Sequence, residues 1–314
     1  MTLLVAITGW EPEPWAERFQ RLMPDLRVVM LGQPFDPADI RYVASWKHPA
    51  DSLANLPNLR VLFSLGAGVD HLFNDPGLPA APIVRVVDPD LTARMSEYVV
   101  LHCLMHLRQQ RRYDLQQQRR QWIDDRFQPA AGNLRVGVMG MGELGRDAAQ
   151  KLAMMGFSVA GWSRSPRRSV HADMFCGNEE IAAFLKRTDV LVVLLPLTPD
   201  TRGVINGKLL RGLARDGAFG GPYLINAGRG GLQVERDILE SLDDGTLLGA
   251  TLDVFEKEPL PESSRLWSHP GVTVTPHNAA MSSPDAIGLQ VADQIAAYER
   301  GEALQNVVDP QRQY

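Results

Sequence analysis

Residues 134–145 read LRVGVMGMGELG, and this stretch decides the fold. The apolar run 134–139 predicts a buried strand, and residues 145–155 carry apolar side chains at helical spacing. A second apolar run, 157–162, predicts another strand directly after that helix. We therefore predict a strand–turn–helix–strand unit, with the glycine-rich turn between the first strand and the helix.

The glycines of the turn have the GxGxxG spacing of a dinucleotide-binding loop. Gly140 would permit the tight turn, Gly142 would let the backbone approach a pyrophosphate, and Gly145 would let the helix pack closely on the strand. The N-terminus of the helix offers free N–H groups to phosphates. The spacing alone is weak, because glycine-rich turns are common, but the flanking strands and helix favour a dinucleotide.

The end of the second strand indicates which dinucleotide binds. Loops that bind NAD usually place an acidic residue there to bind the ribose hydroxyls. This chain has Ser163 at that position, followed by Arg164, and Arg167 and Arg168 add positive charge. A hydroxyl and a guanidinium would bind a 2′-phosphate through charge-assisted hydrogen bonds. We predict NADP(H), with NAD(H) possible at lower affinity; the alternative is a solvated basic loop.

Strand and helix patterns alternate along the whole chain in two series, one before residue 100 and one after residue 134. This predicts an α/β fold with two Rossmann-like, doubly wound parallel sheets. Helical patterns at 95–112 and 285–300 would cross between the two. We expect a discontinuous, flavodoxin-like substrate domain, residues 1–100 and 285–314, with a dinucleotide-binding domain, residues 101–284, inserted into it.

Composition excludes several classes of protein. The formal net charge of -5 argues against a nucleic-acid partner. The longest apolar run, 190–195, is far too short for a membrane helix, and the N-terminus lacks the basic region of a signal peptide. Two cysteines, Cys103 and Cys176, in no metal-binding spacing, predict a reducing cytoplasm and no metal site.

Three later strand ends carry polar residues. Arg229 follows a strand in NAGRG, Glu258 follows another in DVFEKEPL, and His277 follows a third in TPHNAA. Alone, the arginine would be a surface residue and the histidine a structural one. Parallel strands end at the same sheet edge, where ligands of doubly wound folds bind. Together the three residues are the set that a 2-keto acid reductase requires.

The motif order GxGxxG, NAGRG, DVFEKEPL, TPHNAA resembles the D-isomer-specific 2-hydroxyacid dehydrogenase family over nearly the whole chain. Within that family the chain is similar to the short glyoxylate/hydroxypyruvate reductases of bacteria. The residues that support this are LGAGVD at 65–70, WSR at 162–164 and the tail 309–314.

The resemblance implies NADPH-dependent reduction of small 2-keto acids, glyoxylate to glycolate and hydroxypyruvate to D-glycerate. His277 would donate the proton, Glu258 would orient its ring and stabilise the protonated form, and Arg229 would bind the carboxylate and the keto oxygen. Asp253 would meet the nicotinamide amide. The full set of expected cofactor contacts is Gly140, Met141, Gly142, Glu143, Leu144, Gly145, Ser163, Arg164, Ser165, Leu195, Pro196, Ala227, Gly228, Asp253, His277 and Ala279.

The substrate is also expected to contact the first domain. The backbone N–H groups of Ala67, Gly68 and Val69 would bind its carboxylate, and Trp46 would line the pocket. The alternatives are a tight turn chosen for geometry and a partly buried core tryptophan. His48 is expected to be structural because it precedes a proline.

Two expectations concern the surface. Residues 211–222 look longer than the family's usual helix-to-strand turn and would form a flexible surface insertion. The resemblance also implies a homodimer. Rival functions are an NAD-dependent dehydrogenase of another substrate class, such as a phosphoglycerate-type enzyme, and a dinucleotide-sensing protein similar to transcriptional corepressors.

Overall fold

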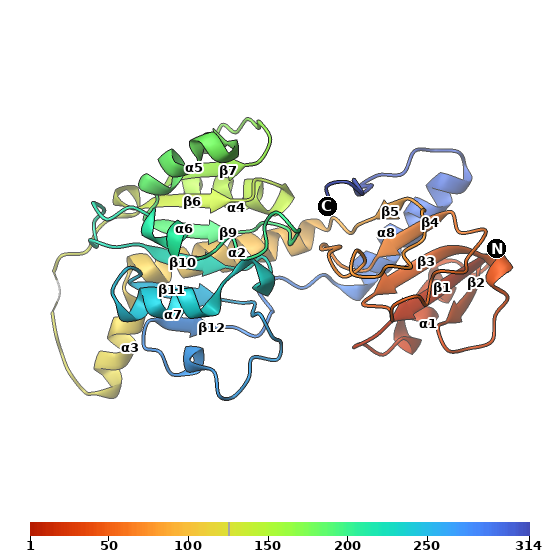
Figure 1. Cartoon of the computed structure of the whole chain (residues 1–314), viewed down its shortest axis with the longest axis horizontal. Helices are drawn as coiled ribbons and strands as arrows, with labels where there is room; N and C mark the ends of the chain where they lie inside the picture. Colours follow the sequence, from red (N-terminus) through yellow and green to blue (C-terminus); the bar gives the residue numbers. More distant parts are fainter. Residues whose placement is uncertain (125) are drawn as a thin grey trace. The chain divides into compact units, whose positions relative to one another are not determined.

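A computed structural model of the chain describes residues 1–124 and 126–314 (Figure 1). The chain divides into two compact units, Met1–Leu91 with Ser282–Tyr314, and Thr92–Met281. Each unit has its own parallel sheet.

The first unit has a five-stranded sheet in the order β2-β1-β3-β4-β5. Every pairing is parallel, and the order 2-1-3-4-5 is that of flavodoxin-like folds. Two helices, α1 and α8, pack against one face of this sheet, and Trp15 and Phe19, one turn apart on α1, are buried there. The elements are β1 (Thr2–Ile7), α1 (Glu13–Leu22), β2 (Arg27–Met30), η1 (Pro37–Asp39), β3 (Ile40–Trp46), β4 (Val61–Ser64), β5 (Ile83–Val84) and α8 (Pro284–Glu299).

The second unit has a seven-stranded sheet in the order β12-β11-β10-β9-β6-β7-β8. The strand order reverses between β6 and β9, which is the switch point where doubly wound folds bind ligands. The strands are β6 (Arg135–Met139), β7 (Ser158–Ser163), β8 (Asp173–Cys176), β9 (Val190–Val193), β10 (Tyr223–Asn226), β11 (Gly249–Leu252) and β12 (Val272–Val274). The helices are α2 (Pro89–Leu107), α3 (Gln110–Gln118), η2 (Ala131–Asn133), α4 (Glu143–Met154), α5 (Gly177–Lys186), α6 (Gly207–Arg211), η3 (Gly230–Leu232), α7 (Glu235–Asp243) and η4 (Arg265–Trp267).

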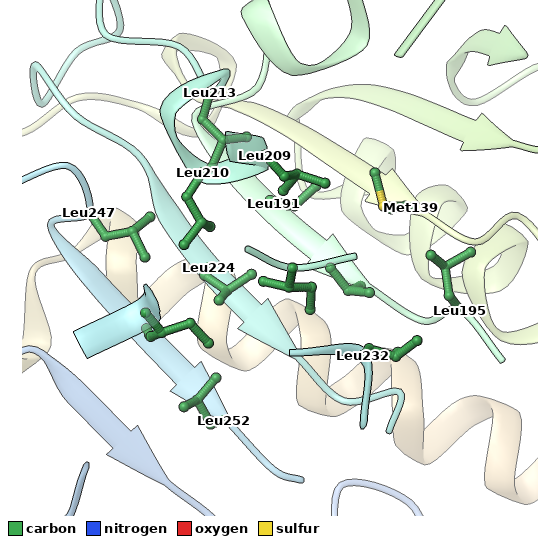
Figure 2. Close-up of a cluster of buried hydrophobic side chains, with 14 of the residues drawn as sticks. Met139, Leu191, Leu195, Leu209, Leu210, Leu213, Leu224, Leu232, Leu247 and Leu252 are labelled. Carbon is green, nitrogen blue, oxygen red and sulfur yellow. The ribbon is translucent and has the colours of Figure 1, made fainter. Parts of the chain in front are cut away.

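Strand β9 shows why this sheet is stable. Leu191 and Val193 belong to one buried apolar cluster, which Figure 2 shows in part, whereas Val190 and Val192 belong to another. Successive side chains of a strand point to opposite faces, so both faces of the sheet are covered. The predicted fold class, two doubly wound parallel-sheet domains, is confirmed.

Two local predictions are corrected, and one strand had not been predicted. The helical pattern 95–112 is two helices, because Gln109 adopts left-handed backbone angles (φ 52°) and ends α2. Strand β8 was not predicted, since it is only partly buried and has little apolar pattern. Residues 211–222 are not a free surface insertion: Leu213 and Ala214 are buried, and Asp216 forms an ion pair with Arg135.

No helix in the described ranges 1–124 and 126–314 is long and apolar enough to cross a membrane.

Candidate active site

The polar residues predicted to carry the chemistry follow three adjacent strands of the seven-stranded sheet. Arg229 comes after β10, Glu258 after β11 and His277 after β12. The three strands are parallel neighbours, so their carboxyl ends lie at one edge. The fold therefore delivers all three segments to the same side of one sheet.

His277 and Glu258 form a hydrogen-bonded pair at that edge. The Nδ1 atom of His277 lies 2.7 Å from Oε2 of Glu258. The other carboxylate oxygen, Oε1, accepts a hydrogen bond from the Phe255 N–H at 3.1 Å, which fixes the carboxylate plane. The side chains keep 45% and 32% of their surface exposed. The outward ring nitrogen, Nε2, is therefore the one available to a substrate.

The backbone around His277 is held in an unusual conformation. His277 has a φ of 53°, in the left-handed region that costs a non-glycine residue of the order of 1 kcal/mol. Its N–H donates to the Asp253 carbonyl oxygen at 2.8 Å. Such a conformation persists only where surrounding bonds determine it, and this hydrogen bond is one of them.

The Asp253 carboxylate supplies the remaining bonds. Its Oδ1 accepts from Thr275 Oγ1 at 2.6 Å and from the Asn278 N–H at 3.0 Å, and its Oδ2 accepts from the Ala279 N–H at 3.0 Å. The residue is 2% exposed. Asp253 thus binds residues before and after His277 in the sequence. Its Oδ2 accepts one of these hydrogen bonds and has the lone pairs to accept another.

Helix α2 supports this anchor from within the core. The Tyr98 hydroxyl lies 2.8 Å from Thr275 Oγ1. Because Thr275 donates its proton to Asp253, Tyr98 is the donor to Thr275. Burial raises the pKa of Tyr98, so it stays protonated. One turn further along α2, burial lowers the pKa of His102 to about 4, and its ring is neutral at physiological pH. No sequence motif included Tyr98, and Thr275 stood in the TPHNAA motif without an assigned role, because their bond depends on contact between α2 and the residue that follows β12.

A glycine brings the Arg229 turn against the Glu258 segment. A Cβ atom on Gly230 would lie 1.7 Å from the Phe255 carbonyl oxygen, so only glycine fits. Arg229 is partly buried and donates from Nη1 to the Gly228 carbonyl oxygen at 2.9 Å. The turn that carries the arginine therefore packs directly on the segment that leads to Glu258.

The GxGxxG turn lies between β6 and α4. Gly140 has a φ of 111°, and a Cβ atom on Gly145 would lie 1.9 Å from the Gly140 carbonyl oxygen. Gly142 is the N-cap of α4, without a side-chain cap, and a Cβ atom there would meet nothing within 4 Å. The turn is tight on its inner side and open at the N-terminus of the helix. Met141 is buried, and Glu143 and Leu144 begin the helix.

The other expected cofactor contacts also follow strand ends. Ser163 ends β7, is buried, and donates to the Ser165 carbonyl oxygen at 2.7 Å. Arg164 is exposed, with Nη1 3.3 Å from Asp200 Oδ2. The remaining positions lie beyond β9, β10 and β12, namely Leu195, Pro196, Ala227, Gly228 and Ala279.

The first unit holds the residues expected to bind substrate. Trp46 ends β3, and its ring lies against Gly66, where a Cβ atom would come within 2.3 Å of it. Ser64 Oγ accepts from the Gly66 N–H at 3.3 Å and so braces the loop that continues through Ala67 and Gly68. Val69, at the end of this loop, is buried.

No group of three or more metal-binding side chains occurs among the residues that the structure describes.

A family model for "D-isomer specific 2-hydroxyacid dehydrogenase, NAD binding domain" matches residues 100–279. The glyoxylate/hydroxypyruvate reductase A of Serratia proteamaculans is 40% identical over 305 residues, 95% of each chain. The chain belongs to the D-isomer-specific 2-hydroxyacid dehydrogenase family. The predicted family is confirmed, and the sequence motifs that carried it lie within the matched residues or in the flanking unit.

Solved structures of this dehydrogenase family agree over the whole chain. An NADPH-dependent glyoxylate/hydroxypyruvate reductase from Sinorhizobium meliloti, in complex with NADP and sulfate, is 48% identical with a TM-score of 0.92, covering 100% of this chain and 99% of that one. A probable 2-hydroxyacid dehydrogenase from Rhizobium etli, in complex with NADP, HEPES and L(+)-tartaric acid, is 46% identical with a TM-score of 0.94 and the same coverage. This dehydrogenase therefore has relatives crystallised with NADP.

Proposed function

We propose that this chain reduces small 2-keto acids, glyoxylate to glycolate and hydroxypyruvate to D-glycerate, with NADPH as the reductant. The observation that carries the proposal is the His277–Glu258 pair at 2.7 Å, at the sheet edge where Arg229 also lies. Relatives named glyoxylate/hydroxypyruvate reductase A, 38–40% identical over most of the chain, support the same reaction.

The residues of the second unit fit NADP(H). Gly142 leaves open space at the uncapped N-terminus of α4, where N–H groups and the helix dipole favour a pyrophosphate. Strand β7 ends at Ser163 and Arg164 follows it, so a hydroxyl and a guanidinium stand where loops that bind NAD usually carry an acidic residue. When bound, the cofactor would supply a hydride to the keto carbon.

His277 would supply the proton. With Nδ1 directed at Glu258, the proton on Nε2 would pass to the keto oxygen as the carbon accepts the hydride, giving the hydroxyl group of the product. The ring then becomes neutral, and Glu258 loses a cationic partner. Before transfer, the carboxylate stabilises the imidazolium and keeps the ring in one orientation.

Arg229 would bind the substrate carboxylate and polarise the keto oxygen. A guanidinium matches a carboxylate in planar, bidentate geometry, and a positive charge near the oxygen stabilises the alkoxide-like transition state. The backbone N–H groups of residues 67–69 would add donors to the carboxylate. Trp46, packed on Gly66, would shape the apolar side of the pocket.

The assay is direct. Purified protein is mixed with NADPH and glyoxylate, hydroxypyruvate or pyruvate, and the nicotinamide absorbance is followed. We expect turnover with the first two acids. Absence of turnover with all three would refute the proposed reductase, and would leave an NAD-dependent dehydrogenase of another substrate class and a dinucleotide-sensing protein as the alternatives.

The cofactor preference rests on Arg164. Replacing Arg164 with Ala should weaken the binding of NADPH more than the binding of NADH. The difference in binding free energy should be about 1–3 kcal/mol, the value of one lost charge-assisted hydrogen bond. A matched control is Arg167→Ala, which removes an exposed charge from the same loop. Equal losses for both dinucleotides would contradict a 2′-phosphate contact.

A homodimer is part of the proposal. Trp122, Ile123 and Phe127 are 97%, 50% and 77% exposed, which is unusual for large apolar side chains near one another in sequence. A second copy of the chain would cover them. Light scattering should give twice the chain mass, and Trp122→Ser with Phe127→Ser should lower it to one chain mass. A monomeric wild-type protein would refute the dimer. A cytoplasmic location stays a prediction.

A further inference from the structure

The first unit contains a second histidine–carboxylate pair, which the reaction above does not use. The Nε2 atom of His48 lies 2.9 Å from Asp75 Oδ2, and Nδ1 lies 2.7 Å from Ser45 Oγ. The side chains of His48 and Asp75 are 0% and 3% exposed. Removing these polar groups from water costs desolvation free energy, so their burial needs a physical explanation.

The order Ser–His–Asp is that of a hydrolase triad, but nucleophilic catalysis is excluded. Ser45 is an interior residue of β3 and is 0% exposed. Its hydroxyl cannot reach an ester or amide. The chain of hydrogen bonds must therefore act on the protein itself.

The hydrogen bonds from Ser45 through His48 to Asp75 join two loops of the first unit. His48 lies in the segment 46–51, two residues after Trp46. Asp75 lies in the segment that continues from the loop 66–69 through a turn in which the Leu72 N–H donates to the Val69 carbonyl oxygen. The His48–Asp75 pair thus links the two loops expected to contact the substrate. The ring of Trp46, packed on Gly66, is a second contact between them.

Asp75 is the centre of the link. Its Oδ1 accepts from the Asp51 N–H at 2.9 Å and from the Gly77 N–H at 2.8 Å. Burial raises the pKa of Asp75, but these two donors and the His48 ring outweigh burial, and the net shift is downward. The carboxylate is therefore ionised, and His48 Nε2 carries the proton that faces it. The Ser45 hydroxyl can donate or accept, so its bond survives either protonation state of the ring.

The loop 46–51 needs this support. Lys47 and Asp51, on either side of His48, have φ values of 47° and 61°. Left-handed conformations of non-glycine residues persist only when surrounding bonds determine them. Here the Asp51 N–H is bound by Asp75, and the Lys47 carbonyl oxygen accepts from Thr8 Oγ1.

We propose that His48 is a positioning residue for the 2-keto acid: it ties residues 46–51 to residues 75–77, so that Trp46 and the loop 66–69 keep one arrangement. This inference rests on the proposed function only for the identity of the substrate. The bridge itself is a property of the first unit.

The test compares His48→Ala, His48→Gln and His48→Asn, with Tyr42→Phe as a matched control. Tyr42 is also a buried, hydrogen-bonded residue of β3, but it binds Glu299 on α8 instead of the two loops. Steady-state kinetics give KM for glyoxylate and kcat, and fluorescence titration gives the Kd for NADPH. Hydrogen exchange reports the opening of residues 46–51 and 66–77.

In His48→Ala, KM for glyoxylate should rise about 10-fold, as expected for one lost bond to a buried charge, with kcat within about 3-fold and Kd for NADPH unchanged. The glutamine amide reaches the position of Nε2 and should keep KM within about 3-fold of wild type. Asparagine reaches only the position of Nδ1 and should resemble alanine. Exchange should accelerate in both loops of His48→Ala and in neither loop of Tyr42→Phe.

Two results would overturn the inference: unchanged exchange in both loops of His48→Ala, or an equal rise of KM in Tyr42→Phe. If alanine prevents folding, the contrast between glutamine and asparagine decides instead, and equal KM values for these two variants would overturn it. Failure of the wild-type protein to reduce any 2-keto acid would refute the proposed function, whereas the exchange experiment would still test the bridge.

Discussion

Two histidine–carboxylate pairs of similar length lie in the two units, and they differ in exposure. His277 and Glu258 are 2.7 Å apart with side chains 45% and 32% exposed, whereas His48 and Asp75 are 2.9 Å apart with 0% and 3% exposed. The first has a ring nitrogen open to a ligand. The second has both ring nitrogens bound to protein. We therefore infer that accessibility decides what a histidine–carboxylate pair can do: the exposed pair could transfer a proton to a ligand, whereas the buried pair could only hold protein segments together.

The largest effect expected from this comparison is the loss of His277. His277→Ala should lower kcat for glyoxylate by about 1000-fold, since general acid catalysis contributes roughly 10²–10⁴-fold. The Kd for NADPH should stay within about 2-fold, because the dinucleotide loop is intact. Stopped-flow hydride transfer and fluorescence titration would measure both. An unchanged rate would show that His277 is not the proton donor, and the exposed pair would then have no assigned role in catalysis.

Glu258→Gln should have a smaller effect, about 100-fold in kcat, because the ring remains but loses the charge that stabilises its protonated form. The measurement is kcat for glyoxylate, with the Kd for NADPH as a check that the variant is folded. An unchanged kcat in Glu258→Gln would contradict the assigned role. Glu256→Gln, on an exposed neighbour, is the control.

Loss of the buried His48–Asp75 pair should lower the stability of the protein more than its catalytic rate. Asp75→Asn should lower the free energy of unfolding at pH 7 by about 1–3 kcal/mol, since the buried His48 ring and two backbone N–H groups lose a charged acceptor. The pKa of Asp75 is lowered from 3.8, so its stabilisation is complete above that value and is lost as the pH falls through the lower, folded-state pKa. The difference between wild type and Asp75→Asn should therefore narrow below pH 3.8. Denaturant unfolding from pH 7 to pH 2.5 checks this, and a gap that widens in acid would contradict the assignment.

Ser45→Ala should have the smallest effect, because it removes one neutral partner and leaves the His48–Asp75 bond in place. We expect KM for glyoxylate to rise by no more than about 3-fold and stability to fall by about 1 kcal/mol. A loss as large as that of His48→Ala would show that the serine, and not the carboxylate, holds the loop.

The fold and much of the candidate site could be predicted from the sequence because both depend on local patterns. Strand and helix periodicity gave the two parallel sheets, and three glycines at fixed spacing gave the dinucleotide turn. Arg229, Glu258 and His277 were each weak candidates alone. Their position after successive strands made them strong, since parallel strands end at one edge.

Contacts between distant segments were not predicted. Asp253 was expected to meet the nicotinamide amide, and nothing in its motif indicated that Thr275, Asn278 and Ala279 bind its carboxylate. Tyr98 had no motif at all. Residues 211–222 were predicted to be a surface insertion. The burial of Leu213 and the ion pair of Asp216 could not be predicted from this segment alone, because both depend on residues far away in the sequence.

His48 shows which properties the sequence determines and which only the tertiary structure decides. The sequence determined its residue type, its place after a strand and the fixed loop that Pro49 implies, and these indicated a structural residue. Only the tertiary structure brought Asp75, 27 positions later, to its ring and excluded water from both. A sequence encodes periodicity and short-range spacing directly, whereas burial and long-range pairing exist only once the chain is packed.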